Sequence, residues 1–164
     1  MNDQPGLDVE HVTVSFVGLP PVLDDVSMSV RSSEVVALLG PSGSGKSTLL
    51  RVIAGIISPD SGRVLIHGAD VTAEPTHRRA VGMVFQDNQL FPHMSALENV
   101  EFGLKMAGIA RPERSERGSA WLRRVGLSGF EKRRVTNLSG GEAKRVALAR
   151  TLATEPAVGL LDEP

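Results

Sequence analysis

Two segments near the start of the chain alternate apolar with polar residues. The alternation covers residues 12–16 in the first segment and residues 22–30 in the second, with a Gly-Leu-Pro-Pro sequence between them. A period of two predicts half-buried strands, and the Gly/Pro sequence predicts a turn. The apolar positions are Val12, Val14, Phe16, Val26, Met28 and Val30. We expect these strands to form an antiparallel piece.

Three later runs are apolar almost throughout. They cover residues 34–39 (EVVALL), 80–85 (AVGMVF) and 157–161 (AVGLL). Such runs predict strands that are buried on both faces of a parallel sheet. Residues 63–67 predict one further strand.

Helical spacing of apolar residues is found in three segments, residues 47–57, 95–126 and 141–153. Within the long second segment, Pro112 and Gly118 are expected to interrupt the helix. Strands that alternate with helices predict an α/β domain with a central parallel sheet.

The composition of the 164 residues is that of a globular domain, with 41% hydrophobic and 23% charged residues. A net charge of -1 provides no overall attraction to nucleic acid or to an acidic membrane surface. The absence of cysteine excludes disulfides, thiolate metal sites and cysteine nucleophiles. Residues 1–10 lack a signal-peptide pattern, and no apolar run approaches the roughly 18 residues that cross a bilayer, so we expect any membrane role to come through a partner.

Charge is distributed unevenly along the chain. Residues 1–34 contain six acids and one base, a balance of -5, whereas residues 111–150 contain eleven bases and four acids, a balance of +7. The basic segment is either a solvated helical surface or a patch that serves phosphates or a partner protein. Nucleic acid is the weakest alternative, because Trp121 and Phe130 are the only aromatic residues there.

The sequence Gly40-Pro-Ser-Gly-Ser-Gly-Lys-Ser47 fits the pattern G-x-x-x-x-G-K-[ST] between a predicted strand and a predicted helix. Glycine permits positive φ and lets backbone N–H groups converge on phosphate oxygens, where the helix N-terminus adds partial positive charge. Lys46 supplies a full charge for the β- and γ-phosphates, and the Ser47 hydroxyl is placed to coordinate Mg²⁺. The alternative, a Gly/Ser turn before an ordinary helix, is disfavoured by this context.

Two carboxylates, Asp162 and Glu163, follow the apolar run 157–161. An aspartate at the end of a buried strand can hold Mg²⁺, often through water. A neighbouring glutamate can polarise a water molecule for attack on the γ-phosphate. Strands commonly end in acids, so this pair indicates a site only in combination with the Lys46 loop.

The sequence Leu138-Ser-Gly-Gly-Glu142 precedes the third predicted helix. Ser-x-x-Glu is a capping box, in which Ser139 caps the helix and Glu142 reaches back. A capping box does not require glycine at positions 140 and 141. Because Gly140 and Gly141 have no side chains, they expose backbone N–H groups at the helix N-terminus. The segment therefore predicts a second anion site.

In this order, the three motifs resemble those of the ATPase subunit of an ABC transporter. Residues 42–50 (SGSGKSTLL) are similar to the Walker A motif, and residues 138–142 are similar to the LSGGQ signature, with Glu142 where glutamine is usual. Residues 146–152 and 159–164 also fit the family pattern, so the resemblance covers nearly the whole chain. The nucleotide-binding residues that it implies are Phe16, Gly40, Pro41, Ser42, Gly43, Ser44, Gly45, Lys46, Ser47 and Thr48. The signature residues that it implies for ATP on an opposite protomer are Ser139, Gly140, Gly141 and Glu142.

The resemblance also implies roles outside these motifs. Phe85-Gln86 is similar to the Q-loop, whose glutamine senses Mg²⁺ and the γ-phosphate. It implies that Gln86 and Glu163 are catalytic, with Glu163 as general base. Phe16 lies where the family places an aromatic residue that stacks on adenine; the alternative is a core residue of a strand. The implied Mg²⁺ ligands are Ser47, Gln86 and Asp162.

The implied cofactors are ATP and Mg²⁺, and the implied partners are the other parts of a transporter. Leu90-Phe-Pro-His93 looks like the importer version of the Q-loop, so the region Gln86–His93 is expected to contact a transmembrane permease subunit. A second ATPase subunit would pair head to tail, and an extracytoplasmic solute-binding protein is a further partner. Nucleic acid is not expected. The implied location is cytoplasmic, at the inner face of the cell membrane.

The implied fold is α/β: a P-loop NTPase (RecA-like) core with an antiparallel β subdomain and a helical subdomain. Residues 1–86 would hold the β piece and the Walker A core. Residues 87–140 would form the helical subdomain, which ends in the signature, and residues 141–164 the signature helix and the Walker B strand.

The family pattern continues beyond Pro164 with a D-loop, a switch histidine and a strand that lies between the Walker A and Walker B strands. All four histidines precede Asp162: His11, His67, His77 and His93. We therefore expect an incomplete ABC ATPase domain, with the C-terminal part of the core missing, that folds poorly and hydrolyses ATP slowly or not at all. The alternatives to an importer subunit are a non-catalytic nucleotide-binding remnant and a soluble, non-transport ABC ATPase.

Overall fold

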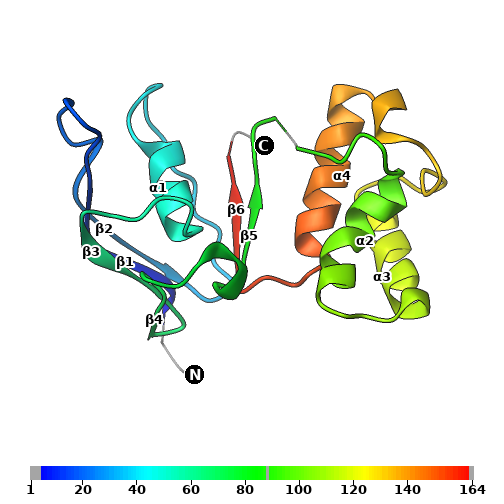
Figure 1. Cartoon of the computed structure of the whole chain (residues 1–164), viewed down its shortest axis with the longest axis horizontal. Helices are drawn as coiled ribbons and strands as arrows, with labels where there is room; N and C mark the ends of the chain where they lie inside the picture. Colours follow the sequence, from blue (N-terminus) through cyan, green and yellow to red (C-terminus); the bar gives the residue numbers. More distant parts are fainter. Residues whose placement is uncertain (1–4, 88, 163–164) are drawn as a thin grey trace. The chain divides into compact units, whose positions relative to one another are not determined.

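The computed structural model describes residues 5–87 and 89–162. The chain divides into two compact units, Met1–Val81 and Gly82–Pro164. In the described part of the chain, the first unit contains a four-stranded sheet and the helix α1, and the second contains a two-stranded sheet and the helices α2, α3 and α4 (Figure 1). None of the described helices is both long and apolar enough to cross a membrane.

The sheet of the first unit is antiparallel, as the alternating sequence predicted. Its strands are β1 (Pro5–Val14), β2 (Leu23–Arg31), β3 (Ser61–Ile66) and β4 (Ala69–Asp70), in the spatial order β2-β1-β3-β4. Val9 in the central strand pairs with Met28 on one side and with Val64 on the other. Val9, Val12 and Val14 are buried, so one face of β1 belongs to the core. The strand ends at Val14, and the prediction that Phe16 continues it is wrong.

Helix α1 (Lys46–Ile53) is shorter than the predicted helix over residues 47–57. It buries Leu49, Val52 and Ile53. The helix ends because Gly55 adopts a φ of +74°, and the N–H groups of Ile56 and Ile57 turn back to the carbonyl of Arg51. This left-handed glycine is a common way to terminate a helix.

The prediction of a buried strand over residues 34–39 is wrong. These residues have no regular secondary structure, and Val35 and Leu39 are 96% and 92% exposed. An apolar strand of this kind needs hydrogen-bonded neighbours and cover on both faces. Among the described residues, no strand pairs with it, because the four-stranded and two-stranded sheets are formed by other segments.

The sheet of the second unit contains β5 (Val81–Val84) and β6 (Val158–Leu161), which lie within the predicted runs 80–85 and 157–161. At the start of β5, a Cβ added to Gly82 would lie 2.8 Å from Pro156, which precedes β6. At its end, Val84 accepts a hydrogen bond from the N–H of Asp162, which follows β6 (3.0 Å). The two strands therefore run in the same direction, as predicted.

Helices α2 (Ala96–Met106), α3 (Arg111–Arg124) and α4 (Gly140–Leu152) pack together in the second unit. Their shared core contains Ala96, Val100, Leu104, Leu122, Leu127, Val146, Ala149 and Ala153. Two short 3-10 helices, Thr76–Arg78 in the first unit and Val135–Asn137 in the second, lie in connecting segments.

Pro112 and Gly118 do not interrupt a helix, contrary to the prediction. Pro112 lies in the first turn of α3, where a missing N–H costs no helical hydrogen bond. Gly118 is buried in the middle of α3, and a Cβ there would lie 2.8 Å from Leu97 in α2, so glycine permits the close approach of the two helices. The break falls instead between Met106 and Arg111, where Gly108 has a φ of +76°.

Two capping boxes fix the starts of α2 and α4. In α4, the Ser139 hydroxyl accepts from the Glu142 N–H (3.3 Å), and the Glu142 carboxylate accepts from the Ser139 N–H (2.7 Å). Ser95 and Glu98 form the same pair of bonds at α2. The hydrogen bond from the backbone of the capping serine, followed by that from its hydroxyl, lowers the pKa of each glutamate below its ordinary value of 4.5.

Leu122 lies at the centre of the helical core and is fully buried. We expect Leu122→Ala to lower the free energy of unfolding by about 2–5 kcal/mol, because it removes buried methyl groups and leaves a cavity. Urea unfolding followed by the fluorescence of Trp121, the only tryptophan, measures this change in the second unit. The exposed Val17→Ala serves as the control, with an expected change within about 0.5 kcal/mol. Equal effects of the two variants would contradict the packing described here.

The capping boxes make a pH-dependent contribution to stability. Because the pKa of Glu98 and of Glu142 is lower in the folded chain, each carboxylate stabilises the fold above about pH 5, and this stabilisation is lost as the pH falls through the lowered pKa. We expect Glu98→Gln and Glu142→Gln to be less stable than the wild type near neutral pH and equal to it in acid. Glu116→Gln, an exposed change on α3, is the control and should show no such convergence. A difference that stays constant with pH would exclude the charged capping interaction.

Candidate phosphate-binding site

The loop of residues 40–45 leads directly into α1. Gly43 and Gly45 both have φ in the left-handed region, at +80° and +86°. At Gly45 the surroundings are also closed, because a Cβ would lie 2.8 Å from the carbonyl oxygen of Val22 and 2.8 Å from the side chain of Leu23. Conformation and space therefore both require glycine at position 45.

The ammonium group of Lys46 lies within this loop. It donates hydrogen bonds to the carbonyl oxygens of Gly40 (2.9 Å) and Pro41 (2.8 Å), and its distance to the Ser44 hydroxyl is 3.4 Å. The Ser44 N–H donates to the Pro41 carbonyl, which closes the loop around the lysine (3.3 Å). The loop thus holds a full positive charge beside its own backbone.

The start of α1 suits an anion for further reasons. Gly45 caps the helix without a side-chain hydrogen bond, and the first turn contains no acidic residue. The first N–H groups of a helix lack intrahelical acceptors and carry partial positive charge. Ser47 and Thr48 are half-buried in this turn, and Ser42 is exposed in the loop. These residues fit a polyphosphate: Gly40–Gly45 would line it, Lys46 would neutralise it, and Ser47 would offer a hydroxyl to an associated cation.

Phe16 lies in the first unit, two residues beyond the end of β1. It is 43% exposed, and its carbonyl accepts a hydrogen bond from the Leu19 N–H (2.9 Å) in a turn. The alternative interpretation of Phe16 as a core residue of a strand is therefore wrong. An accessible ring is what stacking on a base requires, and its contact with adenine stays a prediction.

Gln86 and Asp162 follow the two strands of the second unit. Gln86 is exposed two residues after β5, and Asp162 is buried directly after β6. The hydrogen bond between Asp162 and Val84 brings both strand ends to one edge of the small sheet. Glu163, the predicted general base, lies outside the described residues.

The described residues contain no group of three or more His, Asp or Glu side chains that could hold a metal ion by themselves. Mg²⁺ commonly uses one or two protein ligands together with phosphate oxygens and water, and its binding here stays a prediction. Ser47, Gln86 and Asp162 remain the predicted ligands from the protein. Ser47 belongs to the first unit, and Gln86 and Asp162 belong to the second.

The N-terminus of α4 presents the other predicted anion site. Ser139, Gly140 and Gly141 are exposed, and a Cβ added at either glycine would meet nothing within 4 Å. The packing of this chain therefore does not require glycine there. The opposite end of α4 contacts β5, where the Thr151 hydroxyl lies 3.4 Å from the Met83 carbonyl. About 17 Å of helix separates Thr151 from the glycines.

Asn99 and Arg150 were missed by the sequence analysis, although they fix the segment predicted to face a permease. Asn99 is fully buried; its amide accepts from the Phe91 N–H (2.8 Å) and donates to the Phe91 carbonyl (3.2 Å). Arg150 donates to the Gln89 carbonyl (2.8 Å). Asn99 could have been recognised in the sequence as a polar residue at a buried position of a helix, next to Val100. No local pattern marks Arg150.

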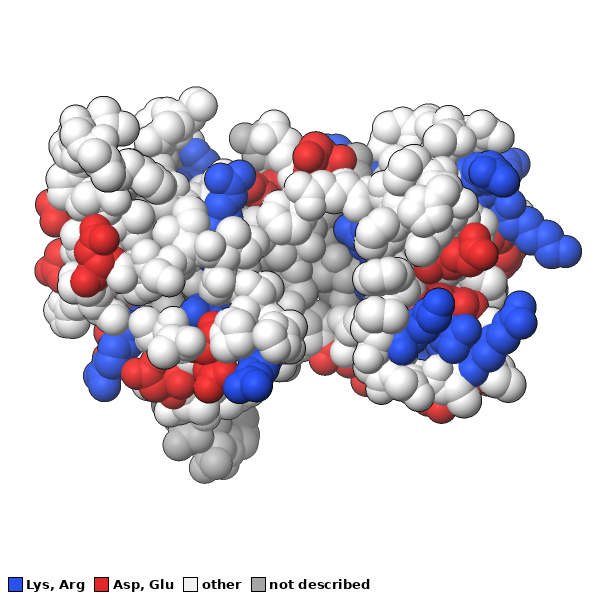
Figure 2. Space-filling view, viewed as in Figure 1, with Lys and Arg blue, Asp and Glu red and all other residues white. Residues whose placement is uncertain are grey.

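Basic side chains gather on the face of the helical unit shown in Figure 2. Several of them have partners within the unit. Arg114 pairs with Glu101 (3.3 Å), and Arg133 lies over the ring of Phe130. Arg117 pairs with Glu155 (3.0 Å), and Arg124 lies over the ring of Trp121. These contacts account for part of the positive charge of residues 111–150 without an external ligand.

Comparisons with known proteins agree with this arrangement. A family model described as "ABC transporter" matches residues 23–164. The chain is 51% identical over 158 residues to the "Fe(3+) ions import ATP-binding protein FbpC" of Streptomyces coelicolor, covering 96% of this chain and 45% of that protein. It is 46% identical to the protein of the same name from Pasteurella multocida, covering 100% of this chain and 47% of that protein. The chain thus spans about half the length of these curated relatives.

A solved structure shares the fold. It is cbiO1 from Clostridium perfringens, described as part of the ABC transporter complex cbiONQ. The TM-score is 0.87 at 34% identity, with 99% of this chain and 66% of that chain covered. The glycine loop that encloses Lys46, the capped signature helix and these matches lead to one conclusion: the chain belongs to the ABC transporter family and has the fold of its ATPases.

Proposed function

We propose that the chain is the ATP-binding and ATP-hydrolysing part of a subunit that powers solute import by an ABC transporter. The observation that carries this proposal is the loop of residues 40–45, which places Lys46 at the start of α1 in a backbone that only glycine allows at position 45. An importer is supported by the names of the curated relatives, which are Fe(3+) import proteins. We therefore propose Fe³⁺ as the solute.

In this proposal, the residues of the first unit bind the nucleotide. The backbone of residues 40–45 and the side chain of Lys46 hold the phosphates, and Phe16 provides a stacking surface for adenine. Ser47, Gln86 and Asp162 are the residues that would hold Mg²⁺. When bound, Mg²⁺ neutralises charge on the β- and γ-phosphates. Glu163 would accept the proton of the attacking water, and Gln86 would sense Mg²⁺ and the γ-phosphate.

The open N-terminus of α4 supports a role toward a second ATPase subunit. Among the described residues, no atom lies within 4 Å of a Cβ added to Gly140 or Gly141, and Ser139 is exposed beside them. A head-to-tail dimer would bring these N–H groups to the γ-phosphate of ATP on the opposite protomer. The segment Gln86–His93, in which Asn99 holds Phe91 and Arg150 holds Gln89, would contact the permease subunit at the inner face of the membrane. A solute-binding protein would deliver the solute to the permease.

The test compares Mg-ATP affinity of the full-length protein with that of Lys46→Met and of Lys105→Met. Lys105 is an exposed lysine at the end of α2, so it controls for the loss of one positive charge. We expect the dissociation constant to rise at least about tenfold for Lys46→Met, because a charged hydrogen-bond donor to phosphate is lost, and to stay unchanged for Lys105→Met. Isothermal titration calorimetry gives both values.

Equal ATP affinity in the wild type and Lys46→Met would refute the proposed site. Turnover in the same preparations distinguishes an ATPase from a non-catalytic remnant. Glu163→Gln should lower the hydrolysis rate by about 100-fold or more while ATP affinity is retained, as expected for loss of a general base. ATP binding combined with a hydrolysis rate that Glu163→Gln does not change would favour the remnant.

A further inference from the structure

Arg79 is a buried cation in the first unit. It follows the 3-10 helix Thr76–Arg78 and is 3% exposed. Its guanidinium group donates to four backbone carbonyl oxygens: those of Val52 (2.8 Å), Ile53 (3.1 Å), Thr72 (2.7 Å) and Glu74 (2.8 Å). One side chain thus joins the end of α1 to the segment of residues 72–74.

The burial of this charge needs a compensating environment. Burial lowers the pKa of Arg79, and the charges of Glu74 and Asp70 oppose the shift, so the guanidinium stays protonated. Val52 and Ile53 provide two of the last carbonyls of α1, where the helix dipole is negative. The Val52 carbonyl also accepts from the Gly55 N–H (3.0 Å), so the guanidinium adds a charged donor at this end of α1 and interacts favourably with the dipole. The buried positive charge of Arg79 therefore lies at the C-terminal end of α1, where the helix dipole is negative.

The Arg79 guanidinium lies so close to the backbone at Gly55 that a side chain at position 55 would not fit. A Cβ added to Gly55, just after α1, would lie 2.6 Å from the Arg79 Cζ. The Thr76 hydroxyl donates to the Gly55 carbonyl (3.0 Å), so residues 76–79 provide two side-chain donors to the end of α1. This end of the helix is held by these side-chain donors as well as by the backbone N–H groups of residues 55–57, which donate to the carbonyls of Val52 and Arg51.

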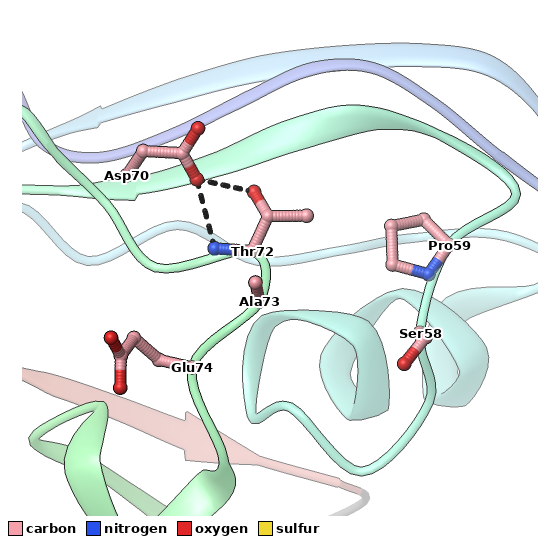
Figure 3. A pocket seen from close by; sticks show the side chains of 6 residues that line it. All are labelled: Ser58, Pro59, Asp70, Thr72, Ala73 and Glu74. Atoms are coloured by element: carbon pink, nitrogen blue, oxygen red, sulfur yellow. Dashed lines mark hydrogen bonds between the residues drawn. The ribbon is translucent and has the colours of Figure 1, made fainter.

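The segment that accepts the other two hydrogen bonds is itself held in place. The Asp70 carboxylate accepts from the N–H (2.9 Å) and the hydroxyl (2.6 Å) of Thr72, as Figure 3 shows. The Thr72 hydroxyl also accepts from the Val64 N–H in β3 (2.8 Å). The same segment borders a pocket of about 420 Å³, lined by Ser58, Pro59, Asp70, Thr72, Ala73 and Glu74. Arg79 therefore connects the end of α1 to a segment anchored on the four-stranded sheet.

We propose that Arg79 is a positioning residue for the phosphate-binding loop, an inference that rests on the proposed function. Helix α1 has eight residues and is about 12 Å long, and it begins at Lys46 and ends at Ile53. Fixing the last carbonyls of so short a helix fixes the direction of its axis. The axis in turn sets where the N–H groups of the first turn and the Lys46 stem point. Arg79 acts on the phosphates through this helix, without touching them.

The test measures the dissociation constants of Mg-ATP, Mg-ADP and AMP for the full-length protein and its variants, by calorimetry at a temperature where each is fully folded. The readout is the ratio of AMP to ATP dissociation constants, which reports the contribution of the β- and γ-phosphates. We expect Arg79→Met to lower this ratio about tenfold and Arg79→Lys, which keeps the charge but loses the fork of donors, to lower it less. Arg78→Met is the matched control, because Arg78 is adjacent and exposed.

A merely structural role would lower the unfolding temperature of the Arg79 variants and leave the ratio at the wild-type value; that result would overturn the inference. Where Arg79→Met does not fold, Arg79→Lys and Thr76→Val, which removes the second donor to the end of α1, decide the question by the same ratio. A wild-type protein without preference for ATP over AMP would refute the proposed function and the inference with it. A preference that Lys46→Met abolishes and the Arg79 variants retain would refute the inference alone.

Discussion

The backbone at Gly45 is the constraint on which the rest of the site depends. Its φ of +86° is disfavoured for residues with a Cβ, and the Val22 carbonyl and Leu23 side chain occupy the place that a Cβ would take. Because the chain can turn there, α1 starts immediately, and the Lys46 side chain folds back onto the carbonyls of Gly40 and Pro41. One glycine in the left-handed region thus determines where a helix begins and where a charge lies.

Local chemistry explains which parts of the structure could be predicted from the sequence. The capping box of Ser139 and Glu142 involves residues three apart, and the sequence contains everything that it needs. The alternation of Val12 and Val14 predicted the last part of β1, and residues 22–30 predicted most of β2, whereas residues 5–11 of β1 and the short strand β4 were not predicted. The glycine loop that encloses Lys46 is encoded in eight consecutive residues, and its binding of phosphate stays a prediction. In each case the interacting groups are near neighbours in the chain or follow a simple period.

The predictions that failed depended on distant partners. The run of residues 34–39 is as apolar as the strand β6, yet it forms no strand, because strand formation requires neighbours that apolarity alone does not supply. Gly118 was expected to break a helix, and it instead permits contact with Leu97 in α2. Arg79 binds the carbonyls of Val52 and Ile53, 27 and 26 residues away in the chain, and no local pattern reveals these partners. Asn99 binds Phe91, eight residues away, from a buried position in α2. Their burial is visible only once the fold is known.

The central claim is that the loop of residues 40–47 binds the phosphates of ATP through its backbone and Lys46. The most direct measurement follows backbone amide resonances of the ¹⁵N-labelled full-length protein as Mg-ATP or AMP is added. The account predicts that Mg-ATP shifts the amides of Gly43, Gly45, Lys46 and Ser47 most strongly and that AMP shifts them far less. Saturation with Mg-ATP that leaves these amides unmoved, or shifts by AMP that equal those by Mg-ATP, would contradict it.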